Sequence, residues 1–258
     1  MENTNVGYNY KILSTKHGSI LTRSFLVTGV SFLLIALIGY AFGILFNKCV
    51  YEWHYFQAVS SLYMISILIV FISIFGSMVV MRNLFTQSTW KIVLWILLYC
   101  LGEGIGCGML FSLFTSDSYS MILIFAVCGV VFGMCALIGY FLNMKAAFGL
   151  AKLLRIAWTC MLFVMFLMFI PMTIMLVSGT TMWGFQWYYW LILGLSAFLF
   201  MGYISFDVWM ISNTAQFLNA GEDRATNNLV LYFGYKLLID LMGLFWTIAT
   251  FFIRFGRR

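Results

Sequence analysis

Seven long apolar runs cover most of this chain of 258 residues. A helix needs about 20 apolar residues to cross the roughly 30 Å hydrocarbon core of a bilayer. Because an open sheet edge in lipid would leave backbone N–H and C=O groups without hydrogen bonds, each run is expected to be a helix. The predicted spans are about 24–46, 58–81, 90–114, 121–143, 153–177, 187–211 and 229–253. The sequence therefore predicts an all-α, polytopic membrane protein.

The composition excludes a soluble fold. Hydrophobic residues make up 64% of the chain and charged residues 9%, whereas soluble domains are roughly 45–50% apolar and about 25% charged. No stretch is long enough for a separate soluble domain, so nucleotide-binding and DNA-binding folds are excluded. We expect a single transmembrane domain over 1–258, no nucleic-acid partner and no resident cofactor. We do not expect the polar segment 1–22 to be a cleavable signal peptide, because about 20 mostly polar residues precede the first apolar run.

Lys and Arg are concentrated in alternate connectors, and this bias sets the orientation of spans. The basic residues are Lys11, Lys16 and Arg23 before the first run, Lys48 after it, Arg82 and Lys91 after the second, and Lys145, Lys152 and Arg155 after the fourth. The pattern predicts a cytoplasmic N-terminus. Arg254, Arg257 and Arg258 would lie outside if the last run crosses fully, and inside if it enters the bundle without leaving it.

Small residues inside the runs are expected to serve helix packing. Glycines four apart, at Gly102/Gly106, Gly104/Gly108 and Gly129/Gly133, make faces that allow close helix approach. Five of the six cysteines lie within apolar runs, where thiols pack as small hydrophobes, so we expect packing rather than disulfide or redox roles. They are Cys100, Cys107, Cys128, Cys135 and Cys160, and Cys49 lies at a span edge. The aromatic cluster at 187–190 is typical of a membrane interface.

Four charged residues lie within or at the edges of the predicted spans: Glu103, Asp207, Lys236 and Asp240. Each costs roughly 2.5–3.5 kcal/mol at a helix centre, and such groups usually face the bundle interior and mark ion or proton pathways. Two acids on neighbouring helices, such as Asp207 and Asp240, cannot both ionise at low cost. They would take up protons as a unit or supply oxygen ligands to Ca²⁺.

Alternatives to a functional role remain open for two of these charges. Lys236 lies one helical turn before Asp240, so the two could neutralise each other as a structural pair. Glu103 either lines an interior cavity or meets water near the outer leaflet. Arg82, at the cytoplasmic end of the second run, is the best counter-charge for Asp207.

Three segments resemble the Bax inhibitor-1-like family of transmembrane proteins. The segment 125–149 resembles the family's apolar run with a Phe-Gly step, Gly-Tyr and a basic loop. The third run, with Leu101-Gly102-Glu103-Gly104, is similar to its Glu-Gly-containing helix. The stretch Leu-Leu-Ile-Asp-Leu-Met-Gly-Leu-Phe at 237–245 resembles its Leu-Tyr-Leu-Asp…Asn-Leu-Phe signature. The chain departs from that signature at Lys236 and Gly243.

The resemblance implies a seven-helix bundle with the last helix central, in a bacterial-type plasma membrane rather than an organelle membrane. It also implies a pH-sensitive Ca²⁺ leak gated by two aspartates, Asp207 and Asp240, with Arg82 as partner. The stretch 213–222 also matches an Asp-Thr…Gly-Glu pattern of some bacterial members, and in that register Asn213 takes the first position. We favour Asp207 because it is the acid present at membrane depth.

The leading functional hypothesis is therefore a non-enzymatic cation leak whose partners are lipid, protons and transiently bound Ca²⁺. The alternative is a non-conducting regulator that binds a membrane protease or another helical membrane protein. An intramembrane aspartyl protease is disfavoured, because the residues before Asp240 lack the Gly-x-Gly-Asp pattern of such enzymes. A proton-coupled transporter would need broken helices at the midplane, and the chain has a single proline, Pro171.

Overall fold

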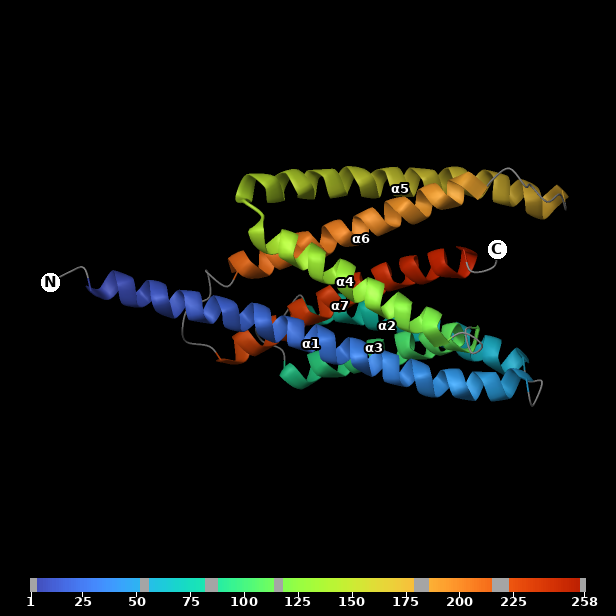
Figure 1. Cartoon of the computed structure of the whole chain (residues 1–258), viewed down its shortest axis with the longest axis horizontal. Helices are drawn as coiled ribbons and strands as arrows, with labels where there is room; N and C mark the ends of the chain where they lie inside the picture. The colour runs from blue at the N-terminus through green and yellow to red at the C-terminus, as the bar shows by residue number, and fades with distance from the viewer. Residues whose placement is uncertain are drawn as a thin grey trace. The chain divides into compact units, whose positions relative to one another are not determined.

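The computed structural model describes residues 4–51, 56–81, 88–113, 118–178, 186–214 and 223–255, and every element in this part of the chain is an α-helix (Figure 1). The all-α prediction is confirmed. The helices are α1 (Thr4–Tyr51), α2 (Phe56–Met81), α3 (Thr89–Leu113), α4 (Ser118–Phe141), α5 (Met144–Ser178), α6 (Gln186–Thr214) and α7 (Asp223–Phe255).

Six helices are long and apolar enough to cross a membrane. Within the described residues, the spans are Ile20–Cys49, Thr89–Ser112, Leu123–Phe141, Met144–Val164, Trp190–Thr214 and Arg224–Ile253. The remaining helix, α2, carries a shorter apolar stretch, Ser61–Gly76. Its 26 residues reach about 39 Å at 1.5 Å per residue. The protein is therefore an integral, multi-pass membrane protein whose outer surface contacts lipid.

Two helix boundaries differ from the prediction. The first helix was expected to start near residue 24, but α1 begins at Thr4 and so includes most of the polar segment 1–22. The fifth helix begins at Met144 rather than near 153, so Lys145, Lys152 and Arg155 lie in its first turns instead of in a connector. Hydropathy marks where a helix enters lipid, whereas backbone hydrogen bonding continues until a residue interrupts it. The connector between α4 and α5 is reduced to Leu142 and Asn143.

The chain divides into two compact units, and α7 belongs to both. Unit 1 contains Met1–Leu123 and Met210–Ile239, and unit 2 contains Ile124–Trp209 and Asp240–Arg258. In unit 1 the first half of α7 bonds to α1, where the Ser24 hydroxyl donates to the Val230 carbonyl at 3.3 Å. In unit 2 its second half packs on α4, with the rings of Phe125 and Phe245 4.8 Å apart. The last helix thus forms part of the core of each unit.

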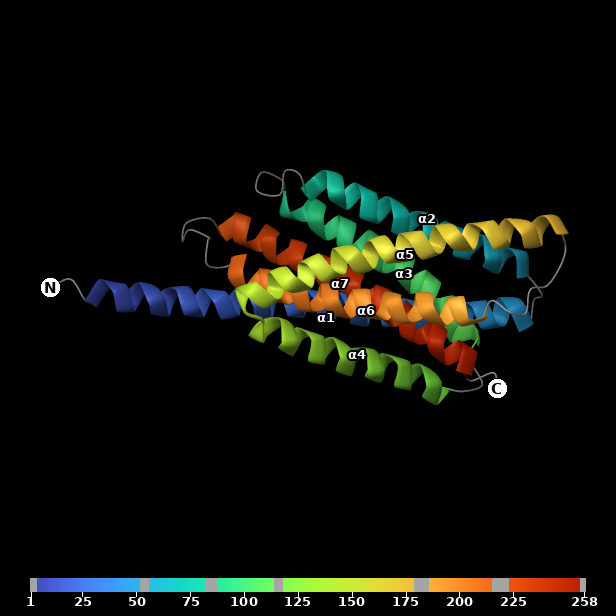
Figure 2. The ribbon, with the colours of Figure 1, turned by 90° about the horizontal axis from the view of Figure 1, so that it is seen from above.

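Glycines hold α1 and α3 at close range in unit 1, where the two helices lie side by side (Figures 1 and 2). Gly39 and Gly43 on α1 meet Gly104 and Gly108 on α3. A Cβ added to Gly108 would lie 3.1 Å from the Gly43 nitrogen and 3.2 Å from the Gly39 oxygen. The predicted packing face at Gly104/Gly108 is confirmed. On the other side of α3, a Cβ at Gly102 would lie 3.2 Å from the Ser66 carbonyl oxygen of α2.

Gly129 and Gly133 on α4, which were expected to serve helix packing, do not pack against another helix among the described residues. A Cβ added at either position meets no atom within 4 Å, and the neighbouring Val130 and Met134 are 63% and 59% exposed. This part of α4 faces outward in the described structure. Helical spacing identifies residues that share a face, but it does not identify which face another helix covers.

Unit 2 is held together by a second close contact, between α4 and α6. Gly139 lies against the backbone of Ser205, whose hydroxyl donates to the Cys135 carbonyl at 2.9 Å. The α5–α6 contact is apolar and centres on buried Leu154, Ala157 and Leu199.

The predicted packing of cysteines inside the helices is confirmed for four of the thiols. All six cysteines are free, and those at 100, 107, 128 and 135 are buried. Cys160 is exposed on α5, so this thiol contributes nothing to the core.

A methyl group added at Gly108 is expected to destabilise unit 1. Its Cβ would lie 2.6 Å from the Phe42 Cβ as well as close to the α1 backbone, so the two helices would have to separate. Overpacking of this kind costs about 1–3 kcal/mol. We expect Gly108→Ala to lower the free energy of unfolding by about that amount, measured by SDS-induced unfolding followed by circular dichroism.

Gly129→Ala is the matched control, because a Cβ at Gly129 has no neighbour within 4 Å. Alanine has a higher helix propensity than glycine, so this variant should unfold with an unchanged or slightly higher free energy. Equal losses in the two variants would contradict the assigned α1–α3 contact.

Candidate functional site

Two intramembrane aspartates lie on the last two helices of unit 2. Asp207 on α6 is entirely buried, with 0% of its surface exposed. Asp240 on α7 is half-buried, and the Oδ2 oxygen of each carboxyl group is a buried atom. Asp207 lies seven residues before Thr214, the end of its span, and Asp240 lies near the middle of the span Arg224–Ile253. Both acids therefore lie within helix segments that are long and apolar enough to span a membrane.

The contacts between α6 and α7 define an antiparallel register. The rings of Trp190 and Phe251 are 5.7 Å apart, and ten residues farther along α6 Phe200 lies on Gly243. Continuing this register by whole turns places Asp240 opposite Tyr203. Asp207 follows Tyr203 by four residues on α6. At 1.5 Å per residue, it therefore lies about 6 Å, or one helical turn, from Asp240 along the interface.

Both acids also lie on the facing stripes of their helices. Asp207 is seven residues from Phe200, and Asp240 is three residues from Gly243, spacings that keep residues on one helix face. The sequence could place the acids at the right depth, but the facing arrangement required the contacts at Phe200 and Gly243.

Three other residues were candidates for this site: Arg82, Lys236 and Asn213. Arg82, the expected counter-charge, lies outside the described residues. Lys236 lies one turn before Asp240 on α7 and is half-buried. Asn213, the alternative to Asp207, is the second-last residue of α6. Both Asp207 and Asn213 lie within the candidate span Trp190–Thr214, so the choice between them stays a prediction.

Two carboxyl groups on facing stripes of neighbouring helices can act chemically in two ways. They can exchange protons with each other and with the solvent as a coupled pair, or they can contribute oxygen ligands to a cation. Among the described side chains, no group of three or more His, Cys, Asp or Glu lies together. Because Ca²⁺ takes 6–8 oxygen ligands, a Ca²⁺ ion at this pair would also need carbonyl, hydroxyl or water oxygens.

Glu103 lies apart from this pair in sequence and belongs to unit 1. Its side chain is 8% exposed and shares a face of α3 with the buried thiols of Cys100 and Cys107, three and four residues away. Of the two expectations for Glu103, the structure favours the interior one, because a carboxyl in water near the outer leaflet would be exposed.

A series of hydroxyl contacts between α1 and α7 was not identified from the sequence. The Thr28 hydroxyl lies 2.9 Å from the Gly234 carbonyl of α7 and 2.9 Å from the Ser24 carbonyl of its own helix. Ser24 donates to Val230 on the same side of α7. The signal was present, because Ser24, Thr28 and Ser31 repeat at a spacing of four and three in an otherwise apolar run.

A further polar contact joins α3 to the start of α7. The Thr89 hydroxyl donates to the Asn228 side-chain oxygen at 2.8 Å, and Asn228 is fully buried. Farther along the same two helices, the rings of Tyr99 and Tyr235 meet edge to face at 5.4 Å. These contacts fasten the first half of α7 inside unit 1.

Comparison with known proteins adds no relative: no family model matches the sequence, and no curated protein or solved structure matches it either. The resemblance to the Bax inhibitor-1-like family therefore depends on the three motifs alone and stays a prediction.

We expect Thr28→Val to weaken the contact between α1 and α7. Valine keeps the shape of threonine but cannot donate to Gly234, and hydrogen bonds between membrane helices contribute about 0.6 kcal/mol on average and at most about 1.7. The free energy of unfolding in SDS should fall within that range.

Thr159→Val is the control, because the exposed Thr159 hydroxyl bonds only to the Arg155 carbonyl of its own helix. A loss as large in Thr159→Val as in Thr28→Val would show that the interhelical bond is not the cause.

Proposed function

We propose that this protein is a pH-sensitive cation leak, with Ca²⁺ as the conducted ion, in which Asp207 and Asp240 bind the gating proton. The observation that supports the proposal is the placement of both acids on the α6–α7 interface of unit 2. Burying a carboxyl at 0% exposure is costly in a protein whose helices are otherwise joined by glycine and hydroxyl contacts. Since those contacts already hold the helices together, a role for the acids in function is favoured over a role in stability.

In the proposed mechanism the charge state of the pair selects between two arrangements of the helices. When Asp207 is ionised and paired with Arg82, the end of the second helix is tied to α6 and the pathway is closed. Protonation of Asp207 removes the charge that holds Arg82, so the ion pair separates and the helices can move. A local change in charge thus shifts a two-state element.

The proposed role of Asp240 is to place a second carboxyl oxygen beside the path. It lies about one turn from Asp207 along the interface, so an ion that leaves one carboxyl can reach the other. Hydroxyl and carbonyl oxygens would complete its ligands, because two carboxyl groups are too few for Ca²⁺. Lys236, one turn away, would lower the residence time of a bound cation by repulsion.

The function is tested by Ca²⁺ entry into dye-loaded liposomes that contain the pure protein, between about pH 8 and pH 5, the range in which physiological proton switches operate. We expect flux to rise as the pH falls. Asp207→Asn, which mimics the protonated acid, should give flux that no longer depends on pH, and Asp240→Asn should reduce the flux.

Two controls make this result interpretable. Thr159→Val, on the exposed side of α5, should keep the pH response of the wild type. Asn213→Ala should keep it as well, and a pH response that is retained in Asp207→Asn would show that Asp207 does not bind the gating proton. Absence of flux at every pH would contradict the leak.

A second candidate, a non-conducting regulator of a membrane protease or another helical protein, is favoured by one observation. Gly129 and Gly133 share the outward face of α4 with exposed Val130 and Met134, where a partner helix could approach closely. This candidate is supported if the pure protein conducts nothing and a membrane protein co-purifies with the wild type but not with Gly133→Leu.

A further inference from the structure

Three cations lie on one exposed face of α5, within the first turns of the helix. Lys145, Lys152 and Arg155 are all exposed, and spacings of seven and three residues keep them on the same side of a helix. Another side of α5 is apolar and packs on α6, where Leu154 and Ala157 are buried. The cations are therefore directed away from the interior of unit 2.

The length of α5 places these cations outside the hydrocarbon core. The candidate span Met144–Val164 belongs to a helix of 35 residues that continues to Ser178. Its part from Ile156 to Ser178 is about 34 Å long at 1.5 Å per residue, which is sufficient to cross the roughly 30 Å core of a bilayer. The segment 144–155 then extends beyond the core. Since Lys and Arg are costly in the core, we expect this segment to lie in the headgroup layer.

An aromatic pair lies at the same level of unit 2. The ring of Phe148, which follows Lys145 by three residues and is 60% exposed, lies 6.1 Å from the ring of Trp209 on α6. Tryptophan is enriched where a membrane meets water. The pair therefore supports the placement of this part of α5 in the headgroup layer.

The exposed charge of this part of unit 2 is entirely positive. The sequence of unit 2 contains two acids, Asp207 and Asp240, and neither α4 nor α5 carries one. Asp207 is entirely buried on α6, and Asp240 is half-buried on α7. A ligand that neutralises the exposed cations of α5 must therefore be an anion.

The exposed surface of α5 changes from cationic to apolar directly after Arg155. Residues 156–178 contain no charged side chain. Among them, Ile156, Leu162 and Phe163 are 50–62% exposed. The helix thus offers cations at the level of the headgroups and apolar side chains at the level of the hydrocarbon, which is the order of the parts of a phospholipid.

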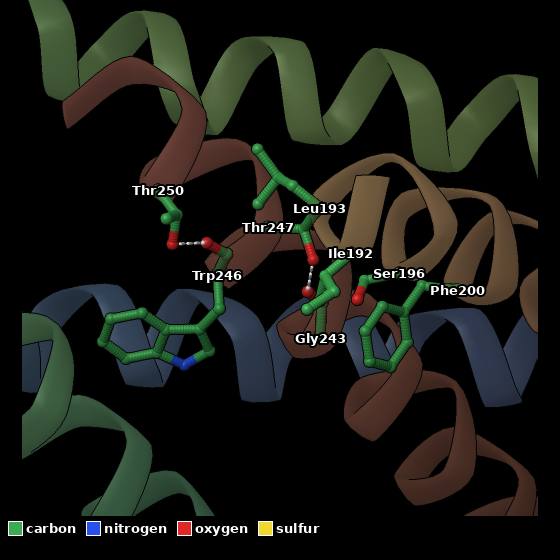
Figure 3. Close-up of a pocket in the computed structure, with 8 residues that line it drawn as sticks. All are labelled: Ile192, Leu193, Ser196, Phe200, Gly243, Trp246, Thr247 and Thr250. Carbon is green, nitrogen blue, oxygen red and sulfur yellow. Dashed lines mark hydrogen bonds between the residues drawn. The ribbon is translucent and has the colours of Figure 1, made fainter. Parts of the chain in front are cut away.

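A second surface of unit 2 differs from this face in its chemistry. The pocket between α6 and α7, shown in Figure 3, is lined by uncharged residues from Ile192 to Phe200 on α6 and from Gly243 to Thr250 on α7. Of these two surfaces, only the face of α5 offers an anion a charged partner.

We propose that the face of α5 formed by Lys145, Lys152 and Arg155 binds the headgroup of an anionic phospholipid. The ammonium and guanidinium groups contact the phosphate oxygens, and the acyl chains extend along the apolar residues that begin at Ile156. A free phosphate ion would match the cations but not the adjoining apolar surface, so a lipid is the occupant that fits both. This inference is independent of the proposed leak, because it requires neither conduction nor a titrating acid.

The test measures lipid binding to the full-length protein in detergent by native mass spectrometry. Phosphatidylglycerol, which has a net negative charge, is compared with phosphatidylcholine of the same acyl chains, which is neutral overall. Each Lys or Arg near a membrane surface strengthens the binding of anionic lipid about five-fold. We expect the dissociation constant to be lower for phosphatidylglycerol by at least that factor, and equal constants for the two lipids would overturn the proposal.

Removing single charges locates the binding face. Lys152→Gln and Arg155→Gln should each raise the dissociation constant for phosphatidylglycerol about five-fold and leave that for phosphatidylcholine unchanged. Lys152→Arg, which keeps the charge, should bind as the wild type does. Lys91→Gln, at an exposed cation on α3 in unit 1, is the matched control and should change neither constant. An equal loss in Lys91→Gln and Lys152→Gln would assign the selectivity to the net charge of the protein and overturn the proposal.

Inorganic phosphate distinguishes a lipid from a soluble anion. Added at constant ionic strength, it should leave the binding of phosphatidylglycerol unchanged, because it has no acyl chains to contact the apolar part of α5. Displacement of the lipid by millimolar phosphate would assign the cations to a soluble anion and overturn the proposal.

Discussion

Polar groups inside a bilayer have no water to bond with, and this constraint governs how the helices of this protein meet. The hydroxyls of Ser24, Thr28 and Ser205 all lie at carbonyl oxygens of a neighbouring helix. Such short side chains reach a neighbouring backbone only where the helices nearly touch. Gly234 and Gly139 stand at these crossings, because a larger residue would hold the carbonyls out of reach.

The two aspartates differ from these hydroxyl groups because a carboxyl group can ionise. A hydroxyl group stays neutral, and once it donates to a carbonyl its burial in lipid costs little free energy. A carboxyl group exchanges protons and carries a charge when ionised, and burying that charge costs much more. Asp207 and Asp240 lie on the facing stripes of α6 and α7, where the Phe200 ring packs on Gly243.

The candidate site was predictable in part. The depth of Asp207, Asp240 and Glu103 follows from their places in apolar runs, because a run of about 20 residues has a defined middle and ends. Their orientation does not follow, since a helix that is apolar on every side carries no signal for its buried face. The interior placement of Glu103 and the outward direction of Gly129 and Gly133 came only from the packed structure.

Hydrophobicity alone is sufficient to specify the class of this protein, its helices and the approximate position of each span, because the free energy of placing apolar residues in lipid depends on composition and length. Which helices touch depends on shape. The contact of Gly39 and Gly43 with Gly104 and Gly108, the bonds from α1 to α7, and the facing acids of α6 and α7 join residues far apart in the chain. Such contacts are selected by the fit of whole helix surfaces, a property that no local stretch of sequence contains.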